Sequence, residues 1–390
     1  MKDRILLSQP FKIVCFICIG VGIAAICYGF IYDPQRTWAN YLLNNFYFLS
    51  LSIGAAFFLG LQAITQSGWS AGFRRIPEAM MMYIPVAGAL MLLLFFGMQY
   101  LYSWTHPDVI AASIIIKSKT AYLNIPFFFI RMIVFFSIWI LLTRLIRKAS
   151  LNEDETGGLI YFRKIEWYSK VLIFFLALSF SLLGFDLLMS IDVKWFSTIY
   201  ALKNFIAAFL HGSATIYIIV FLLNRRGYFK FLNVSHIHDF ARYIFIVSIF
   251  YGYFWFSQFI LIWYGNIPDE TIYYAKRWTP EWQPFWAADI IINWIVPFFV
   301  LLPVNTSRNK WIVFTVALLL AIGQWVDLYV EIFPGIISNP KSGFIEIGTF
   351  TGFIGLFAFF TGYSLSRAAL VPKNHPLINE SYHHHFESYI

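Results

Sequence analysis

The chain has 390 residues, of which 59% are hydrophobic and only 12% are charged, and its formal net charge is +8. This composition excludes an ordinary soluble globular domain, in which about a quarter of the residues are charged. Aromatic residues make up 21% of the chain, and their amphipathic rings settle where a membrane meets water. No basic cluster with interleaved aromatics stands out in a soluble segment, so we expect contact with a lipid bilayer and no nucleic-acid partner.

Long apolar runs recur along the whole chain and predict its architecture. The run from Arg242 to Tyr264 is typical, because about twenty apolar residues in a helix span the roughly 30 Å hydrocarbon core of a bilayer. Ten such spans are predicted, at about 12–31, 42–65, 79–102, 124–146, 169–190, 197–224, 241–264, 285–306, 309–332 and 346–367. The linkers are too short for a separate domain. We therefore expect an all-α integral membrane protein with one membrane domain (1–390), built as two four-helix bundles plus one extra helix at each end.

Lysine and arginine residues are distributed unevenly between the loops, and this orients the spans. An even number of spans puts both termini on one side of the membrane. The N-terminus, the even-numbered loops and the C-terminal tail hold 19 Lys and Arg residues, the odd-numbered loops hold 8, and Arg131 lies within a span. Because positive residues are enriched on the cytoplasmic side, the sequence predicts that both termini, and the tail 371–390, are cytoplasmic.

Ionisable or strongly polar side chains inside spans are the candidate functional residues. Each charged one costs about 2.5–3.5 kcal/mol on insertion scales and has to face a protein interior or water. The candidates for a proton pathway are Asp186, His211, Asp289, Gln324 and Asp327, and the candidate charge partners are Arg131 and Lys203. Their spacing places several on shared helix faces, such as Asp289 with Asn293 and Gln324 with Asp327.

Two interpretations of these residues remain open. In the first, Arg131 and Lys203 neutralise two or three carboxylates and lock the bundle, since buried charges usually pair. In the second, the polar side chains form a hydrated route for protons or other ions, with His211 as its central relay because imidazole exchanges protons near neutrality. For Glu331 and Asp192, which lie near helix ends, we expect an interfacial position without a function.

The sequence also lacks the usual signatures of redox or nucleotide chemistry. A haem held between membrane helices needs two histidines within spans, and only His211 qualifies. The chain has no CxxCH, no four-cysteine cluster motif, no GxGxxG at a strand–helix junction and no P-loop. We therefore expect no catalytic residue, no cofactor-binding residue and no metal ligand in this chain.

Several stretches resemble the polysulfide reductase NrfD-like family of membrane subunits. The shared block is Ser235-His-Ile-His-Asp239, Trp255-Phe-Ser-Gln-Phe259 and Ile262-Trp-Tyr-Gly-Asn-Ile-Pro-Asp-Glu270. Within the family the chain is most similar to the ActF-type subunits of bacterial alternative complex III. The stretches that favour this type over its ActC-type sister are Asn45-Phe-Tyr-Phe-Leu-Ser-Leu-Ser-Ile-Gly54, Arg74-Arg-Ile-Pro-Glu-Ala-Met80 and Leu370-Val-Pro-Lys-Asn-His-Pro376 with His383-His384-His385. The likeness covers nearly the whole chain.

The resemblance implies a function in electron transport. It implies a multi-pass subunit of a quinol:electron-acceptor oxidoreductase in the respiratory chain, in the bacterial inner (cytoplasmic) membrane. Partners would be a sister NrfD-like subunit, subunits that carry haem c and iron–sulfur clusters, and in some cases a terminal oxidase. Menaquinol or ubiquinol would be the substrate of the complex. The family's ActF-type subunits have been proposed to conduct protons, which agrees with buried acids in a chain without its own redox centre.

Two alternatives stay open beside this scaffold and proton-conducting role. In one, this chain is itself the quinol-binding subunit, with the aromatic span 241–264 holding the ring and His211 or Asp186 accepting a proton. In the other, the chain is a stand-alone secondary transporter. Transporters tend to have matched helices broken near the midplane, whereas here Pro85 and Pro297 lie at unequal depths in their spans. The leading hypothesis remains an electron-transport subunit that takes part in proton translocation.

Overall fold

A computed structural model of the chain describes residues 4–385, which are almost entirely helical. Over this range the one β-contact is a bridge between Arg4 and Ala369. Ten helices or runs of helices are long and apolar enough to cross a membrane. The predicted all-α membrane fold is therefore confirmed. The last residues of the predicted tail 371–390 lie outside the described range.

Eight of the ten spans are single helices: α1 (Gln9–Tyr32), α2 (Pro34–Ile64), α8 (Ile125–Thr156), α9 (Leu159–Leu187), α10 (Thr198–Arg225), α11 (Val234–Gly265), α16 (Lys310–Ile332) and α17 (Phe344–Ser366). The third span, Ala71 to Leu101, is broken and contains α3 (Arg75–Met80), α4 (Ile84–Leu92) and α5 (Met98–Leu101). The eighth span is also broken and contains α13 (Gln283–Ile290) and α14 (Val296–Leu301). The short helices between or after them are α6 (Pro107–Ala111), α7 (Ile114–Lys119), α12 (Pro268–Arg277), α15 (Val304–Ser307) and α18 (Ile378–Tyr382).

Capping residues fix where several spans begin. The side chain of Asp33 accepts a hydrogen bond from the backbone of Arg36 at the start of α2, and Pro34 occupies the first turn. Asn124 caps α8 and Asn309 caps α16 in the same way. A polar capping residue is thus the local signal that starts each of these helices. The apolar run follows at once or, as in α2, after a polar first turn.

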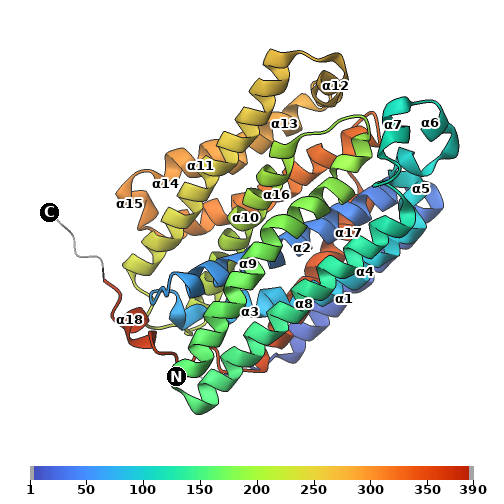
Figure 1. Cartoon of the computed structure of the whole chain (residues 1–390). Coiled ribbons are helices and arrows are strands. Elements are labelled where there is room, and N and C mark those ends of the chain that lie inside the picture. The colour runs from blue at the N-terminus through green and yellow to red at the C-terminus, as the bar shows by residue number, and fades with distance from the viewer. Residues whose placement is uncertain (1–3, 386–390) are drawn as a thin grey trace.

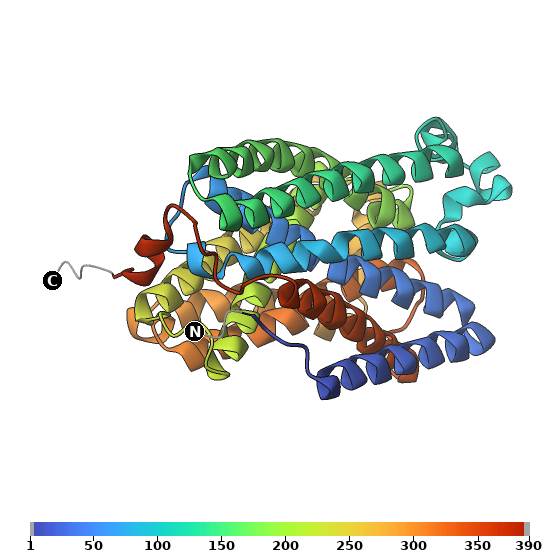
Figure 2. The ribbon, with the colours of Figure 1, turned by 90° about the horizontal axis from the view of Figure 1, so that it is seen from below.

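The helices form two four-helix groups with a pair at one side (Figure 1). The first bundle contains α2, the span α3–α5, α8 and α9, and the second contains α10, α11, the span α13–α14 and α16. The extra helices α1 and α17 pack against each other and against α2. Figure 2 shows this pair along the outside of the molecule. The two extra helices, predicted from opposite ends of the chain, are therefore neighbours in space.

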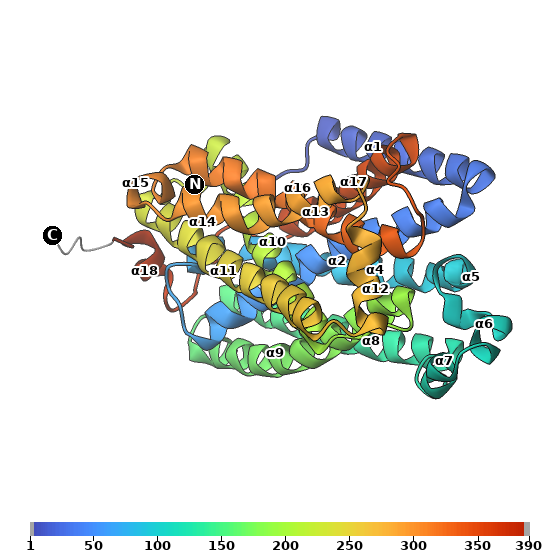
Figure 3. The same cartoon turned by 90° about the horizontal axis from the view of Figure 1, so that it is seen from above.

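Both described ends of the chain lie at one face of the bundle, which we call the terminal face. Figure 3 shows α15 and α18 at this end and α5, α6 and α7 at the other, which we call the opposite face. The bridge from Arg4 to Ala369 holds the two described chain ends together. The terminal face is the one that the lysine and arginine distribution predicts to be cytoplasmic.

The two bundles meet where α2 crosses α10. Every residue of α2 from Thr37 to Ala56 is buried, so this helix forms the centre of the molecule. At the crossing, Gly54 lies so close to α10 that an added Cβ would be 1.9 Å from the carbonyl oxygen of Ala208, and a Cβ on Gly212 would be 2.8 Å from the backbone of Gly54. Two glycines facing each other thus let the backbones approach, as small residues do in membrane helix pairs.

A bulkier residue at this crossing should separate the bundles. We expect Gly212→Leu to lower the free energy of unfolding by about 1–3 kcal/mol or more, because an overpacked core forces backbone shifts. The measurement is thermal unfolding of the purified chain in detergent. The matched control is Gly20→Leu, since an added Cβ there has no heavy atom within 4 Å. Equal melting temperatures for the two variants would contradict the close crossing.

Candidate functional site

A cluster of charged side chains lies inside the second bundle, near its opposite-face end. Lys203 extends from α10 and donates to Asp327 Oδ1 and Glu331 Oε1 of α16, each at 2.5 Å. Asp327 and Glu331 are one turn apart on one face of α16. Tyr200, on the preceding turn of α10, donates to the other oxygen of Glu331 at 3.0 Å. All four side chains are buried, so one ammonium group is shared by two carboxyl groups away from water.

A third carboxyl group, that of Asp289 on α13, lies beside this cluster. It accepts hydrogen bonds from Tyr251 Oη at 2.7 Å and from Trp255 Nε1 at 3.0 Å. Both donors come from one face of α11. The side chain of Asn293 donates a third bond at 2.8 Å. Asp289 is therefore held by neutral donors, and no cation within residues 4–385 forms an ion pair with it.

Asn293 connects Asp289 to His211. It lies in a π-helical turn, Ile291–Ile295, between α13 and α14; such turns occur often at functional sites. Its side-chain NH₂ also donates to the carbonyl of Gly323 at 3.1 Å, and its Oδ1 lies 3.0 Å from His211 Nε2. His211 Nδ1 lies 2.5 Å from the carbonyl oxygen of Ala207. Both ring nitrogens of His211 thus face acceptors, and only a ring with a proton on each nitrogen donates to both.

A cavity of about 30 Å³ is lined both by the Lys203 cluster and by Asp289. The residues that line it are Lys203, Trp255, Gln258, Tyr273, Tyr274, Arg277, Trp286, Asp289, Asp327, Val330 and Glu331. A space of this size holds one or two water molecules. Asp327 Oδ2 and Gln258 Oε1 are buried and have no hydrogen-bond partner among the described residues. The cavity therefore offers a small polar space with acceptors that a water molecule would satisfy.

An ion pair closes the opposite-face side of the cluster. Arg277, at the end of α12, donates to two backbone carbonyls in the last turn of α16. These are the carbonyls of Val330, at 2.9 Å, and of Glu331, at 2.6 Å. Its guanidinium also contacts Asp192 at 3.2 Å, and Lys276 donates to the same carboxylate at 2.6 Å. Burial alone would raise the pKa of Asp192, but the two positive charges outweigh it and hold that pKa below its usual value.

The sequence-predicted residues fall into three places. Asp289, Asp327 and Lys203 meet around the cavity, and His211 is joined to them through Asn293. Gln324 donates to Ser50 of α2 at 3.4 Å. Asp186 is paired in the first bundle with Arg131 by two bonds of 2.8 and 2.9 Å, with the ring of Tyr122 over the guanidinium at 3.8 Å. The structure thus gives Asp186 a local partner apart from the other acids.

Two residues expected at the interface near helix ends have charged partners in the structure. Glu331 is buried and bonded to Lys203, and Asp192 is half-buried and bonded to Arg277. The spacing of four between Asp327 and Glu331, which puts both on one face of a helix, is the signal that could have placed Glu331 with the cluster. Tyr200, Tyr251 and Trp255 carried no such signal, because aromatic residues are too common in this chain to single out three of them.

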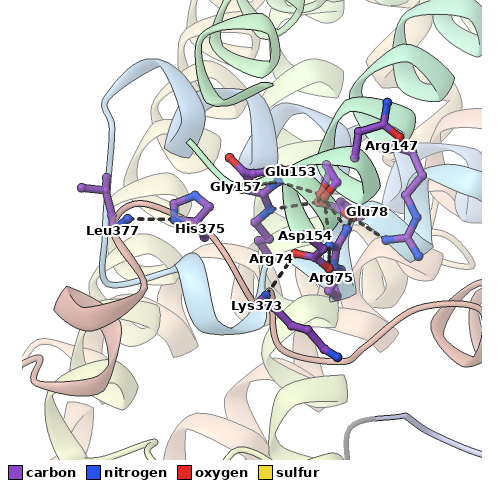
Figure 4. Close-up of polar contacts among 12 residues, drawn as sticks. Arg74, Arg75, Glu78, Arg147, Glu153, Asp154, Gly157, Lys373, His375 and Leu377 are labelled. Carbon is purple, nitrogen blue, oxygen red and sulfur yellow. Dashed lines mark hydrogen bonds and ion pairs between the residues drawn. The ribbon is translucent and has the colours of Figure 1, made fainter. Parts of the chain in front are cut away.

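A second charged cluster, which the sequence interpretation missed, lies at the terminal face of the first bundle. It joins three arginines, Arg74, Arg75 and Arg147, to three carboxylates, Glu78, Glu153 and Asp154, beside Ser150 (Figure 4). Glu78 is its centre and is bonded to all three arginines, with Arg74 at 3.1 Å and Arg75 at 2.7 Å. Its three cations and three anions balance.

The C-terminal segment, residues 367–385, is bound to this cluster. The backbone NH of Lys373 and the side chain of Asn374 donate to Asp154 at 3.0 and 2.8 Å (Figure 4). His375 is buried, and its Nδ1 accepts from the backbone of Leu377 at 3.1 Å. Burial, reinforced by the positive charge of Arg74, lowers the pKa of His375 to about 3. The segment is therefore held with His375 neutral.

A comparison with models of protein families and with curated proteins found no match to this chain. The fold and the buried charges nevertheless define a class of protein. The chain is an all-α integral membrane protein that crosses the bilayer many times. Within residues 4–385, no three His, Cys, Asp or Glu side chains converge in a way that would hold a metal ion.

Removing the shared ammonium should destabilise the second bundle. We expect Lys203→Met to lower the free energy of unfolding by about 3–5 kcal/mol, because it leaves buried carboxyl groups without a cation. The triple variant Lys203→Met, Asp327→Asn, Glu331→Gln should recover most of the loss. Denaturant unfolding in detergent measures both. A single variant as stable as the wild type would show that Lys203 is not paired as described.

Acid should release the C-terminal segment. Because the pKa of docked His375 lies below the value of about 6.5 for a free histidine, its contribution to docking is full above about pH 6.5 and is lost as the pH falls toward 3. Hydrogen exchange of residues 370–385, corrected for intrinsic rates, should therefore rise between pH 7 and 5. His375→Phe, which keeps an aromatic ring against Phe162, should remove most of this dependence. An equal rise in the variant would contradict the role of His375.

Proposed function

We propose that this chain is a membrane subunit of a quinol:electron-acceptor oxidoreductase of the alternative complex III type, and that it scaffolds the complex and conducts protons. The specific support is the resemblance of its long motifs to ActF-type subunits. The ten-span fold in two four-helix bundles is compatible with that assignment. Partner subunits would supply haem c and iron–sulfur clusters, and menaquinol or ubiquinol would be oxidised outside this chain.

The observation that carries the proton-conducting part is the charge imbalance around the small cavity. Asp289, Asp327 and Glu331 contribute three carboxyl groups, while Lys203 contributes one ammonium. Arg277 also lines the cavity, but its charge is matched by Asp192. With every group ionised, two net negative charges would be buried, which is costly in a medium of low dielectric constant. A neutral cluster holds two exchangeable protons instead. Loading and releasing these protons is the chemistry that the arrangement supports.

The proposed route runs from this cluster toward the middle of the bundle. A water molecule in the cavity would exchange protons between Asp327, Glu331 and Asp289. Asn293 then positions Asp289 and His211 without carrying the proton itself, because an amide is neither an acid nor a base near neutral pH. His211 is the acceptor at the far end, with its ring nitrogens next to the carbonyl oxygen of Ala207 and to Asn293 Oδ1. A further water molecule would carry the proton past Asn293 to this ring. Asp186, paired with Arg131 in the other bundle, is a structural ion pair in this proposal.

The size of the cavity argues against quinol binding at this site. Trp255 and Trp286 line it and would suit an aromatic ring. However, the space is about 30 Å³, whereas a cavity that binds a single benzene ring is about 150 Å³. Water and protons fit the site, and a quinol ring does not.

The proton-conducting role is tested in the assembled complex. We expect Asp289→Asn and Asp327→Asn each to lower the number of protons released per electron by about half or more, while quinol oxidation continues. The measurement is proton release during turnover in liposomes that contain the purified complex. Asp269→Asn changes an exposed aspartate near the same face and should leave the ratio unchanged. Unchanged ratios in both cluster variants would leave only the scaffold role.

Membership of a complex is tested separately. Purification of the chain from its native membrane in mild detergent should recover haem-bearing companions, visible by absorption spectroscopy and mass spectrometry. A chain that is recovered alone, or only with copies of itself, would contradict the proposed assembly and favour a stand-alone transporter.

A further inference from the structure

A half-open cleft of about 490 Å³ lies at the terminal face, between the second-bundle helices α10, α11 and α16. The residues that line it are Tyr217, Val220, Phe221, Asn224, Leu232, Asn233, Val234, His236, Ile237, Phe240, Arg308, Asn309, Lys310 and Trp311. Its walls are mostly apolar or aromatic, and its cations come from one short stretch before and at the start of α16. None of the described lining residues is acidic.

The two cations of this cleft are available to a ligand. Arg308 and Lys310 are exposed, and neither forms an ion pair with a described residue. A third cation, Arg225, lies over the ring of Trp311 with its guanidinium carbon 5.0 Å from the ring centroid. This contrasts with the other cluster at this face, where three arginines are matched by three carboxylates. The cleft therefore concentrates positive charge that no carboxylate of residues 4–385 pairs with.

The backbone around the cleft adds to this positive potential. The N-termini of two long helices, α11 and α16, open into it, and the first turn of a helix carries partial positive charge. Asn233 and Asn309 cap these turns. Tyr217 donates to the carbonyl of Lys310 at 2.9 Å, which holds the start of α16 against α10. The cations are thus presented from a fixed position.

The surface that leads away from the cleft is apolar. Trp311, Leu318 and Ile322 lie along one face of α16, and they are 48%, 41% and 57% exposed. Phe221 packs against Trp311 with ring centroids 5.0 Å apart. The cleft thus joins cations at the end of the spans to an apolar strip that continues along the membrane-crossing part of α16. A molecule with an anionic head and long acyl chains has this distribution of charge and apolar surface.

We propose that this cleft is a binding site for an anionic phospholipid, with the phosphate contacted by Arg308 and Lys310 and the acyl chains lying along α16. Basic pockets between membrane helices on the cytoplasmic side bind anionic lipid head groups elsewhere by this chemistry. The site is independent of the proton route, because it lies at the other end of the second bundle from Lys203 and Asp327.

The test compares lipid binding by the purified chain in detergent, measured by native mass spectrometry with phosphatidylglycerol and with phosphatidylcholine. We expect the first phosphatidylglycerol to bind at least about tenfold more tightly than phosphatidylcholine. The double variant Arg308→Gln, Lys310→Gln should bring this ratio close to one. The matched control is Arg163→Gln, Lys164→Gln, which removes two exposed cations near the same face outside the cleft, and it should keep the preference.

Three outcomes would overturn the proposal. The first is equal binding of the two lipids by the wild-type chain. The second is an equal loss of preference in both double variants, which would show an effect of overall charge. The third is complete displacement of phosphatidylglycerol by millimolar inorganic phosphate, which would make the cleft a site for a free anion. Equal melting temperatures of the two double variants will exclude misfolding as the cause of a selective loss.

Discussion

The ammonium group of Lys203, buried between two carboxyl groups, sets the character of the second bundle. A charge inside an apolar bundle is tolerated only when an opposite charge and hydrogen bonds compensate for lost hydration. Lys203 meets that condition, and it also brings α10 and α16 together where the cavity lies. Tyr200 and Arg277 contact Glu331 in the same small region, and Asp289 lines the cavity there.

The balance of charge separates three of the clusters of buried charge into two kinds. Arg131 and Asp186 form a pair of one cation and one carboxylate, and the Glu78 cluster contains three arginines and three carboxylates. Such balanced groups hold helices together because they contain as many cationic as carboxyl side chains. The cluster around Lys203 has three carboxyl groups for one cation. The proposed proton binding rests on this excess of carboxyl groups over cations, which the other two clusters do not have.

The ten spans could be predicted because length and hydrophobicity alone decide which segments cross a bilayer. The polar ends of helices could not be predicted in this way. The apolar run of α8 stops near residue 146, yet the helix continues to Thr156. The extension carries Arg147, Glu153 and Asp154, whose charges are paired with α3. Tertiary contacts therefore decide where such a helix ends, and these contacts cannot be predicted from the number of apolar residues. The C-terminal segment was predicted as a plain tail for the same reason.

The candidate site was predictable only in part, since a sequence gives helix faces but not the partner of each face. The spacing of Asp327 and Glu331 placed both on one side of α16, and the choice of Lys203 as a charge partner agreed with the contacts found. By contrast, the link between Asp289 and His211 runs through Asn293, which lies in the π-helical turn Ile291–Ile295. The spacing of four predicts that Asn293 meets Asp289, but it does not predict that the same side chain donates to Gly323 of α16 and faces His211 of α10. Nothing in the local sequence IINWI predicts the π-helical turn itself.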